Sequence, residues 1–371
     1  MTVLICIPCL LCGGTEMQTL NLAQALLTCG HKVVILCYFE YLPEIVAQFN
    51  DIGSQVICLS PSGKRTHGLR MIKHLYKGIN NVINKIKPQV VHVQYMTPGA
   101  IPILLLRLLG INNIIATIHT TADIYSSLRI VHFIQRYCVR SFNCVTKTAE
   151  RSFFNNTHLY TTDIQLQKRN HFTLYNCLSQ AIDPITTPRK DHPIRTIGFV
   201  GRLEKIKGAD LVIPAFASGY KENRQLRLLI VGDGSLRSFM QKQSQQLQVA
   251  DRIEWAGMQQ QTQLQTFYDR IDLLLIPSRS EGFGLTALEG MARGCIVLAA
   301  QVGGLCELIE EEQSGLLHIP EDIDDMVRCI KRVVGNQKLR NYFAERAVLR
   351  ARQFDFKQYS ILVNSLHCKF I

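Results

Sequence analysis

Two glutamates separated by seven residues follow a short apolar run, in a stretch whose chemistry suits phosphates and hydroxyl groups. The stretch reads Ser280-Glu281-Gly282-Phe283-Gly284-Leu285-Thr286-Ala287-Leu288-Glu289-Gly290, after an expected strand over residues 272–277. The glycines let a ligand approach the main chain, and a helix N-terminus offers free N–H groups to an anion. Glu289 could accept hydrogen bonds from a ribose diol, and Glu281 could reach sugar hydroxyls. The alternative is a glycine-rich turn with two solvated glutamates.

Two cations mark a second strand-to-helix junction. The segment Gly201-Arg202-Leu203-Glu204-Lys205-Ile206-Lys207-Gly208 follows an expected strand over residues 196–200. Arginine supplies a planar fork and lysine a compact charge, so Arg202 and Lys207 could flank a diphosphate. The same pair could neutralise a departing diphosphate in place of a metal ion. The alternative is ordinary surface charge.

The N-terminal half carries two weaker signals. Gly13 and Gly14 precede Thr15 and Glu16 at the first strand-to-helix turn, but the turn lacks the G-x-G-x-x-G pattern of a dinucleotide site. Their value lies in flexible backbone beside a helix N-terminus. His119 follows an expected strand over residues 113–118 and could hydrogen-bond a transferred sugar, or it could be a structural histidine.

Short apolar runs alternate with helical periodicity along nearly the whole chain, which predicts an α/β fold. Expected strands cover residues 2–12, 32–39, 55–59, 89–93, 113–118, 143–146, 196–200, 226–231, 253–256, 272–277 and 295–299. Expected helices cover residues 15–29, 69–86, 101–109, 124–139, 208–218, 235–249 and 284–293, and three amphipathic segments follow. Residues 183–193 contain three prolines and are expected to form a linker.

Alternating strands and helices on both sides of this linker predict two doubly wound, Rossmann-like domains with parallel sheets. Ligands of such sheets bind at the carboxyl ends of the strands, so we expect the domains to face each other across a cleft that holds the site. The expected boundaries are residues 1–186 for the first domain and 187–354 for the second.

The composition is globular and basic. The 371 residues are 47% hydrophobic and 19% charged, with a formal net charge of +12, which suggests phosphate-bearing partners. Residues 1–185 hold 16 Lys or Arg and 8 Asp or Glu, a net of +8. This excess is either a solvated helix face or a surface for peripheral contact with an anionic membrane. Nucleic acid is excluded as a partner, because no recognised module or aromatic platform accompanies the charge.

The thirteen cysteines do not form a disulfide framework, since many lie in or beside apolar runs. Cys6, Cys9 and Cys12 have no matching second cluster, so no metal site is expected, and a reducing cytoplasm is the expected location. The N-terminal apolar run lacks a basic leader, and no apolar stretch is long enough for a membrane span. Asp322-Ile323-Asp324 is expected to cap a helix rather than bind metal.

Together these motifs resemble the retaining glycosyltransferases of family 4, which have the GT-B fold and use nucleotide sugars. The matching segments are Gly-Gly-Thr-Glu at 13–16, Gly-Arg-Leu-x-x-x-Lys-Gly at 201–208, Val-Gly-Asp-Gly at 231–234, the two spaced glutamates, Val-Gly-Gly-x-x-Glu at 302–307 and Gly-Leu-Leu at 315–317. The match is strong over residues 194–320 and looser over 1–185. It departs at Asn176-Cys177-Leu178-Ser179, where members often have Asn-Gly-(Ile/Val)-Asp.

The resemblance implies a role for each candidate residue. Arg202 and Lys207 would bind the donor diphosphate and stabilise the leaving nucleotide, and Glu289 would hold the ribose. Glu281, Gly282 and the backbone of Phe283, Gly284, Leu285 and Thr286 would hold the sugar and distal phosphate. His119 would contact the donor sugar, and Gly13 and Gly14 the phosphates or the acceptor. No metal or other cofactor is expected, and residues from about 355 to 371 would pack back on the first domain.

The sequence therefore predicts a retaining hexosyltransferase that uses a nucleotide diphosphate sugar, with UDP favoured over GDP. The acceptor expected is a lipid-linked glycan or a precursor of cell-surface polysaccharide or lipopolysaccharide. Two alternatives stay open: a nucleotide-sugar epimerase of the same fold, and a non-catalytic donor-binding subunit of a two-chain transferase.

Overall fold

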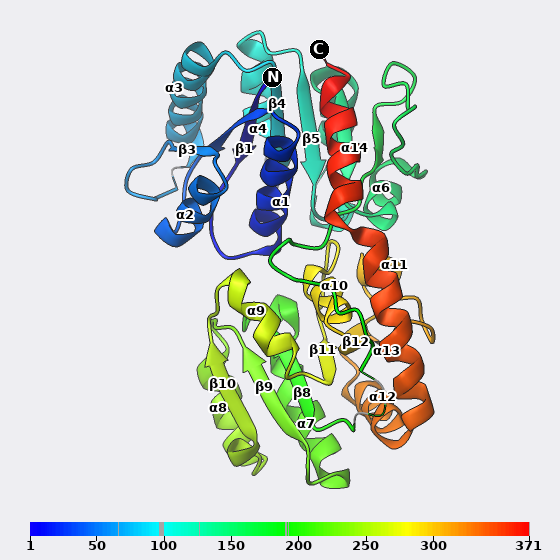
Figure 1. Cartoon of the computed structure of the whole chain (residues 1–371). Coiled ribbons are helices and arrows are strands. Elements are labelled where there is room, and N and C mark those ends of the chain that lie inside the picture. Colours follow the sequence, from blue (N-terminus) through cyan, green and yellow to red (C-terminus); the bar gives the residue numbers. More distant parts are fainter. Residues whose placement is uncertain (66, 96–99, 126, 190, 192, 371) are drawn as a thin grey trace. The chain divides into compact units, whose positions relative to one another are not determined.

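The chain folds into two compact units in a computed structural model that describes residues 1–371 apart from 66, 96–99, 126, 190, 192 and 371. The first unit comprises residues 1–177 and 356–371, and the second comprises residues 178–355. Each unit contains one sheet covered by helices (Figure 1).

The first unit contains a seven-stranded sheet in the order β3-β2-β1-β4-β5-β6-β7, and the neighbouring strands pair in parallel. Its strands are β1 (Thr2–Ile7), β2 (Lys32–Cys37), β3 (Gln55–Cys58), β4 (Val90–Tyr95), β5 (Ile114–Ile118), β6 (Ser141–Cys144) and β7 (His171–Thr173). Helices cover both faces, so the central strands are continuous apolar runs rather than alternating ones.

Two helical layers pack on this sheet. One layer contains α1 (Gly14–Thr28), α2 (Pro43–Asp51) and α14 (Phe356–Cys368). The other contains α3 (Gly68–Ile86), α4 (Ala100–Leu108), α5 (Leu128–Phe133), the π-helical turn η2 (Ile134–Cys138) and α6 (Lys147–Phe154). A short 3₁₀ turn, η1, covers Ala122–Ile124. The two layers bury separate apolar clusters on opposite faces of the sheet.

The second unit contains a six-stranded parallel sheet in the order β10-β9-β8-β11-β12-β13. Its strands are β8 (Thr196–Val200), β9 (Arg227–Val231), β10 (Ile253–Gly257), β11 (Leu273–Ile276), β12 (Ile296–Ala300) and β13 (Leu316–His318). Its α-helices are α7 (Ala209–Glu222), α8 (Arg237–Gln246), α9 (Gln261–Tyr268), α10 (Leu285–Ala292), α11 (Leu305–Leu308), α12 (Ile323–Gly335) and α13 (Gln337–Ala351). The 3₁₀ turns are η3 (Lys205–Lys207), η4 (Ala250–Arg252) and η5 (Arg352–Phe354).

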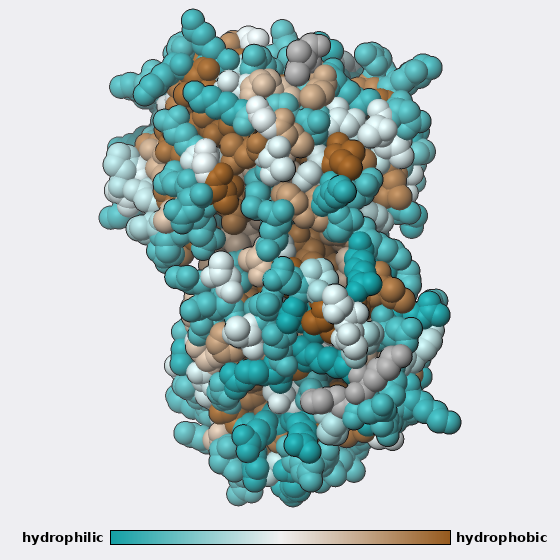
Figure 2. Space-filling view, viewed as in Figure 1, coloured by the Kyte–Doolittle hydropathy of each residue, from teal (hydrophilic) through white to brown (hydrophobic). Residues whose placement is uncertain are grey.

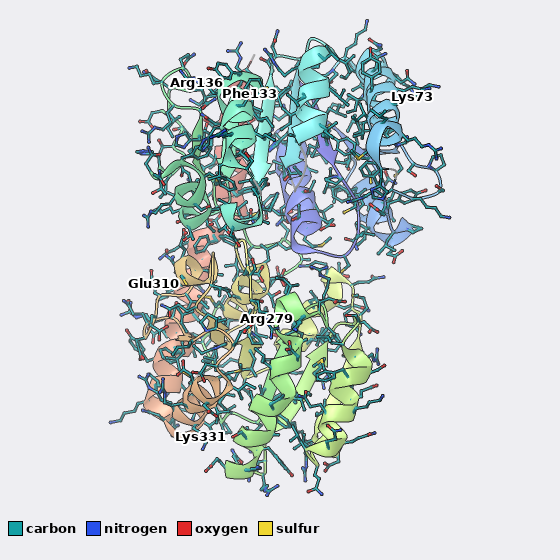
Figure 3. The ribbon with its side chains drawn as sticks, turned by 180° about the vertical axis from the view of Figure 1, so that it is seen from behind. Lys73, Phe133, Arg136, Arg279, Glu310 and Lys331 are labelled. Atoms are coloured by element: carbon teal, nitrogen blue, oxygen red, sulfur yellow. The ribbon has the colours of Figure 1, made fainter. Side chains whose placement is uncertain are left out.

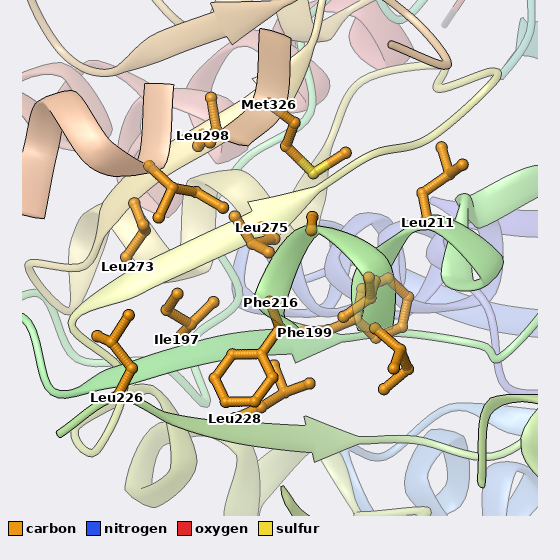
Figure 4. Close-up of a cluster of buried hydrophobic side chains, with 14 of the residues drawn as sticks. Ile197, Phe199, Leu211, Phe216, Leu226, Leu228, Leu273, Leu275, Leu298 and Met326 are labelled. Carbon is orange, nitrogen blue, oxygen red and sulfur yellow. The ribbon is translucent and has the colours of Figure 1, made fainter. Parts of the chain in front are cut away.

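Figure 4 shows part of the apolar core of the second unit. Phe199 on β8, Phe216 on α7 and Leu275 on β11 are all buried in it. This packing fixes the strands whose carboxyl ends carry the motifs at 201–208 and 280–290.

Residues 178–194 belong to the second unit, so the expected boundary after residue 186 lies too late in the chain. The Leu178 N–H donates to the Phe354 carbonyl, and the Ile185 N–H donates to the Ala292 carbonyl. The Arg189 guanidinium donates to the carbonyls of Ile271 and Tyr268 at 2.9 and 3.0 Å. The expected linker is therefore held against the second unit at Ile185 and Arg189, two of its described residues.

Several elements differ from expectation. The first strand ends at Ile7, because Pro8 has no N–H for the ladder, rather than at residue 12. The helix expected over 124–139 divides into η1, α5 and η2. Helices α2, α6, α9 and α11 and the three-residue strands β7 and β13 were not predicted.

Helix α14 returns from the end of the second unit to lie beside α1 in the first (Figure 1). Buried Tyr359, Val363 and Leu366 join its apolar cluster. Polar contacts add to this packing: His31 Nε2 lies 2.7 Å from Asn364 Oδ1, and Lys369 donates to the carbonyls of Thr162 and Ile164.

Candidate functional site

The strand order reverses between β8 and β11, which are neighbours in the sheet of the second unit. The loops that follow these two strands therefore run in opposite directions. In α/β proteins, ligands bind at such a point, at the carboxyl ends of the strands. The segment 201–208 follows β8, and the segment 280–290 follows β11. The two strongest sequence motifs therefore lie side by side at this point.

The loop after β8 is held by backbone hydrogen bonds to the loop after β9. The Leu203 N–H donates to the Asp233 carbonyl at 2.9 Å, and the Glu204 carboxylate accepts from the Ser235 N–H and hydroxyl at 2.9 and 2.6 Å. These hydrogen bonds lower the pKa of Glu204. Gly208 has φ +67°, and a Cβ there would lie 1.9 Å from the Pro277 carbonyl oxygen, so the close approach of these loops requires glycine.

Lys207 and Glu281 form an ion pair across the two loops. Lys207 Nζ lies 2.6 Å from Glu281 Oε2, and the two side chains are 27% and 16% exposed. The Ser278 hydroxyl donates a longer hydrogen bond, at 3.3 Å, to the same oxygen. The pair is therefore partly shielded from water, but a ligand can still reach it.

Arg279 holds the turn that contains Lys207 in place. This residue was not identified from the sequence. Its guanidinium makes a bidentate pair with Asp210 at 2.7 and 2.9 Å, and it also contacts Glu321 and the Lys205 carbonyl. Its own N–H donates to the Ile206 carbonyl. Figure 3 labels Arg279 in the second unit. Its signal in the sequence was a cation directly after a buried strand, in Ser278-Arg279-Ser280.

The Arg279–Asp210 contact shifts both pKa values. Burial raises the pKa of Asp210, but the hydrogen bonds and charge of Arg279 more than offset it, so the net shift is downward. The same hydrogen bonds raise the pKa of Arg279. Both groups are therefore charged at neutral pH and hold η3 in place.

The Val-Gly-Gly motif after β12 packs directly on the Glu281 backbone. The Gly304 N–H donates to the Glu281 carbonyl at 3.0 Å. A Cβ at Gly303 would lie 2.1 Å from that same oxygen. This part of the motif therefore positions Glu281.

Glu289 is buried at the inner side of α10, with both oxygens engaged. Oε1 accepts from Gln261 Nε2 at 2.6 Å, and Oε2 accepts from the Tyr268 hydroxyl at 2.7 Å. Burial raises the pKa of Glu289, and the two hydrogen bonds oppose that shift. A carboxylate can accept further hydrogen bonds through its remaining lone pairs, so a ribose contact is compatible with this geometry. Sequence reasoning missed Gln261 and Tyr268, which lie on the unpredicted α9.

The segment between the two glutamates ends in an open helix N-terminus. Gly284 caps α10 at φ +100°, and no side chain caps it. Phe283 is buried and contacts Phe354 edge to face, at 5.6 Å between ring centroids, and this packing holds the loop in place. Gly282, Leu285 and Thr286 are partly exposed, which leaves the first N–H groups of α10 within reach of an anion.

Arg202 is exposed after β8, and the described residues show no ion pair for it. It lies in the same loop as Lys207 but at the opposite end from η3. Its guanidinium therefore remains available to an anionic ligand.

In the first unit, Gly13 and Gly14 stand at the start of α1. Gly13 is extended, with φ −167°, and a Cβ there would lie 2.6 Å from Glu16 Oε2. A side chain at position 13 would therefore have to displace the Glu16 carboxylate, whereas the backbone conformation there does not require glycine.

His119 follows β5 and is buried, with 9% of its surface exposed. Its Nε2 lies 2.6 Å from Gln94 Oε1 on the neighbouring strand β4. Burial lowers the pKa of His119 to about 4, so the ring is neutral at physiological pH. Sequence reasoning did not single out Gln94.

Asp322 caps α12, as expected: its Oδ1 accepts from the Asp325 N–H at 2.9 Å. Among residues 1–371 without the gaps given above, no helix is both long and apolar enough to cross a membrane.

Two family models together match most of the chain. The model for glycosyl transferases group 1 matches residues 185–350, and the model for glycosyltransferase family 4 matches residues 12–162. The chain belongs to glycosyltransferase family 4. The family resemblance inferred from the motifs is thereby confirmed, and the protein is a glycosyltransferase.

Curated relatives agree with this membership. An uncharacterized glycosyltransferase of Methanocaldococcus jannaschii is 25% identical over 354 residues, covering 93% of this chain and 92% of the relative. The D-inositol 3-phosphate glycosyltransferase of Corynebacterium glutamicum is 31% identical over 182 residues, covering 47% of this chain and 43% of the relative. Other alignments span still less: the chain covers 39% of a second M. jannaschii glycosyltransferase.

Solved structures confirm the fold. Anabaena HepE in complex with UDP matches over the full length of both chains at 17% identity, with a TM-score of 0.79. The lipopolysaccharide outer core galactosyltransferase WaaB matches over both full chains at 18% identity, with a TM-score of 0.72. The predicted GT-B architecture of two Rossmann-like α/β domains is therefore correct.

Proposed function

We propose that this glycosyltransferase transfers a hexose from UDP-sugar to a lipid-linked acceptor, with retention at the anomeric carbon and without a metal ion. The observation that carries the proposal is the Lys207–Glu281 pair at the carboxyl ends of β8 and β11. Exposed Arg202 and the uncapped start of α10 stand on the same two loops.

The cationic groups suit a diphosphate that leaves with negative charge. As the bond from the anomeric carbon to the β-phosphate oxygen breaks, the electron pair goes to that oxygen. Lys207 and Arg202 would stabilise the charge, and the first N–H groups of α10 would bind the distal phosphate. The acceptor hydroxyl would attack from the same face and pass its proton to the departing phosphate, which gives retention. Lys207 and Arg202 would together supply the positive charge that a metal ion would otherwise supply.

The remaining donor contacts follow from the same loops. Glu289 would bind the ribose hydroxyls, because Tyr268 and Gln261 already orient its carboxylate. Glu281, held by Lys207 and Gly304, would contact sugar hydroxyls. UDP is favoured over GDP, in line with the HepE complexes that contain UDP and UDP-glucose.

The lipid-linked acceptor is supported by the charge pattern of the first unit. Residues 52–149 contain twelve Lys or Arg and a single acidic residue, Asp123. A surface so poor in carboxylates attracts anionic lipid, at about 1 kcal/mol for each basic side chain near the membrane.

Exposed apolar side chains accompany this charge on three helices of one layer. They recur three or four residues apart, which places them on one face of each helix: Leu69, Ile72 and Tyr76 on α3, Leu104 and Leu108 on α4, and Ile130, Phe133 and Tyr137 on α5 and η2. Helix α4 contacts both α3 and η2, so the three faces adjoin. Brown side chains among teal ones are visible over α3 in Figure 2, and Figure 3 shows Lys73, Phe133 and Arg136 on this layer. We call this the α3–α5 face.

Calorimetric titration with UDP, GDP and their sugars, with EDTA present throughout, tests the donor site. Tight binding of UDP in EDTA and transfer to a lipid-linked acceptor are expected. Binding without transfer would favour a donor-binding subunit, and conversion of the free UDP-sugar to an epimer would favour an epimerase. Absence of UDP binding would overturn the proposal.

Vesicle sedimentation tests the α3–α5 face. Leu108→Ser should reduce binding to vesicles with anionic lipid by about tenfold, since a buried leucine contributes about 1.5–3 kcal/mol. Phe239→Ser on α8 of the second unit is the matched control, because Phe239 is equally an exposed apolar residue. Equal binding by both variants, or equal binding to neutral vesicles, would contradict the membrane assignment.

A further inference from the structure

The first unit contains an internal polar pocket at the carboxyl edge of its sheet. Its polar lining residues are Gln18, His92, Gln94, Thr117, His119, Asn143, Asn176, Tyr359 and His367. Gln18 and Gln94 are 3% and 2% exposed, and the Nε2 of each is buried with no hydrogen-bond partner among the described residues. The donor end of Gln94 therefore lies on the pocket, while its acceptor end contacts His119.

The hydrogen bonds of this region have only one consistent direction. His367 Nδ1 must donate to the Val363 carbonyl, at 2.8 Å, so the Nε2 of the neutral ring must accept. His92 Nδ1, at 3.2 Å, then donates to it, and His92 Nε2 accepts from the Thr117 hydroxyl at 2.7 Å. Burial lowers the pKa of both histidines, which keeps both rings neutral. The Thr117 hydroxyl proton is thus used by His92, and it cannot orient His119.

Gln94 alone determines the proton position on His119 among the described residues. A carbonyl oxygen can only accept, so the 2.6 Å contact with Gln94 Oε1 requires the proton on His119 Nε2. His119 Nδ1 then carries a lone pair. That atom has no hydrogen bond to a described residue and is not among the buried unpartnered atoms, so it is open to a ligand.

We propose that Gln94 is a positioning residue that holds the proton of His119 on Nε2, so that Nδ1 accepts a hydrogen bond from a hydroxyl of the bound sugar. The inference rests on the proposed function, because His119 contacts the sugar only in that assignment. A carboxylate in place of Gln94 would favour the imidazolium, which would donate at Nδ1. A neutral amide keeps the ring an acceptor and so selects a hydroxyl donor there.

The proton position can be measured without any ligand. In the full chain labelled with ¹⁵N-histidine, His119→Gln identifies the signals of His119, and two-bond ¹H–¹⁵N couplings show which nitrogen carries the proton. Wild type should show Nε2–H, and Gln94→Met should lose that preference. Gln94→Glu should keep Nε2–H and raise the pKa of the ring. Gln18→Met, which removes the other amide whose Nε2 has no partner among the described residues, should leave His119 unchanged.

Binding measurements then test the sugar contact. Gln94→Met should weaken UDP-sugar by about three- to tenfold, the value of one hydrogen bond, and leave UDP unchanged because UDP has no sugar. At a pH above the pKa of the His119 ring, Gln94→Glu should bind UDP-sugar more tightly than Gln94→Met does.

Each contrary result would contradict a different part of the proposal. A wild-type proton on Nδ1, or an unchanged proton position in Gln94→Met, would overturn the role of Gln94. Equal weakening of UDP and UDP-sugar would overturn the sugar contact. Absence of UDP binding by wild type would overturn the proposed function and the sugar contact together, whereas the proton position would still be read from the spectrum.

Discussion

The candidate polar groups of the two units are held in opposite ways. In the first unit, His92 and His367 are joined by a hydrogen bond, His119 is hydrogen-bonded to Gln94, and all three rings are buried and neutral. At the carboxyl edge of the second sheet, Lys207, Glu281 and Arg279 are charged and partly exposed. The same strand–helix architecture thus supports buried neutral groups in one unit and a partly exposed ionic site in the other.

This contrast separates stability from activity. A buried neutral group is costly to charge or to leave unpaired, so changes at the His92–His367 contact should act mainly on folding. A partly exposed ion can rehydrate, so its removal should leave folding nearly intact and act on the charge that develops during the reaction. The following changes test this division.

Lys207→Ala should have the largest effect, a loss of about 10²–10³ in kcat, by comparison with removal of one donor to a developing oxyanion. The thermal unfolding midpoint should change little. Lys205→Ala, in the same turn but exposed, is the control and should keep near-normal turnover. Wild-type kcat in the Lys207 variant would remove this lysine from the reaction.

Acid should destabilise the first unit before the second. The pKa values of His119 and His367 fall from 6.5 to about 4 on folding, because burial disfavours the charged ring. The unfolded chain binds more protons between pH 6.5 and 4, so stability decreases as pH falls through that window, by about 3 kcal/mol per histidine. The hydrogen-exchange protection factors of α14 and β4, which correct the measured rates for the intrinsic rate at each pH, should fall from pH 6.5 to 4.5.

The control for the acid experiment lies in the other unit. The protection factors of β8 and β11, whose neighbouring charged groups form ion pairs, should change less over the same pH range. A first unit that responds no more than the second, or an unaltered pH response in His367→Gln, would contradict the buried-histidine explanation.

Arg279→Lys should lower kcat by about tenfold, because lysine cannot reproduce the bidentate contact with Asp210 and the hold on the Lys205 carbonyl. Affinity for UDP should change less than kcat, since Arg279 acts through the position of Lys207. Arg293→Lys, at the Asp269 contact, is a matched control with little expected change in turnover. Equal effects of the two substitutions would indicate a general loss of packing.

Tyr268→Phe should have the smallest effect. Loss of the hydroxyl that donates to Glu289 Oε2 should raise the pKa of Glu289 further and reduce affinity for UDP by a few fold, or about 1 kcal/mol. Titration of UDP at pH 6 and pH 8 checks this, with a larger deficit at the lower pH. An equal deficit at both values would argue against the carboxylate as the ribose ligand.

Much of the fold was predictable because strands buried on both faces are continuous apolar runs. Those runs placed β2, β8 and β11 with small errors at the ends, and they located β1 but extended it five residues too far. Strands β7 and β13 have only three residues, and α6 begins with Lys147 and includes Glu150 and Arg151, so neither gives a clear periodic signal. The Pro-rich segment led to a wrong domain boundary, because its hydrogen-bond partners, such as Tyr268 and Ile271, are distant in the chain.

The candidate site was predictable where a motif is local and not where it depends on a partner. Lys207 and Glu281 were each identified, but their pairing spans 74 residues and requires β8 and β11 to be neighbours. Gln94 gave no signal, because a single glutamine in an apolar strand is uninformative until its partner is known. The roles assigned to the individual residues of the site remain predictions.

The return of α14 also sets an order of events during synthesis. The first unit cannot bury Val363 and Leu366, or close the His92–His367 contact, until every residue of the second unit has been translated. At a synthesis rate of about 5–20 residues per second, the part of the first unit against which α14 packs therefore stays exposed for roughly ten to forty seconds. Its exposed apolar surface during that interval is a natural target for a chaperone, whereas the second unit is contiguous and can fold as it emerges.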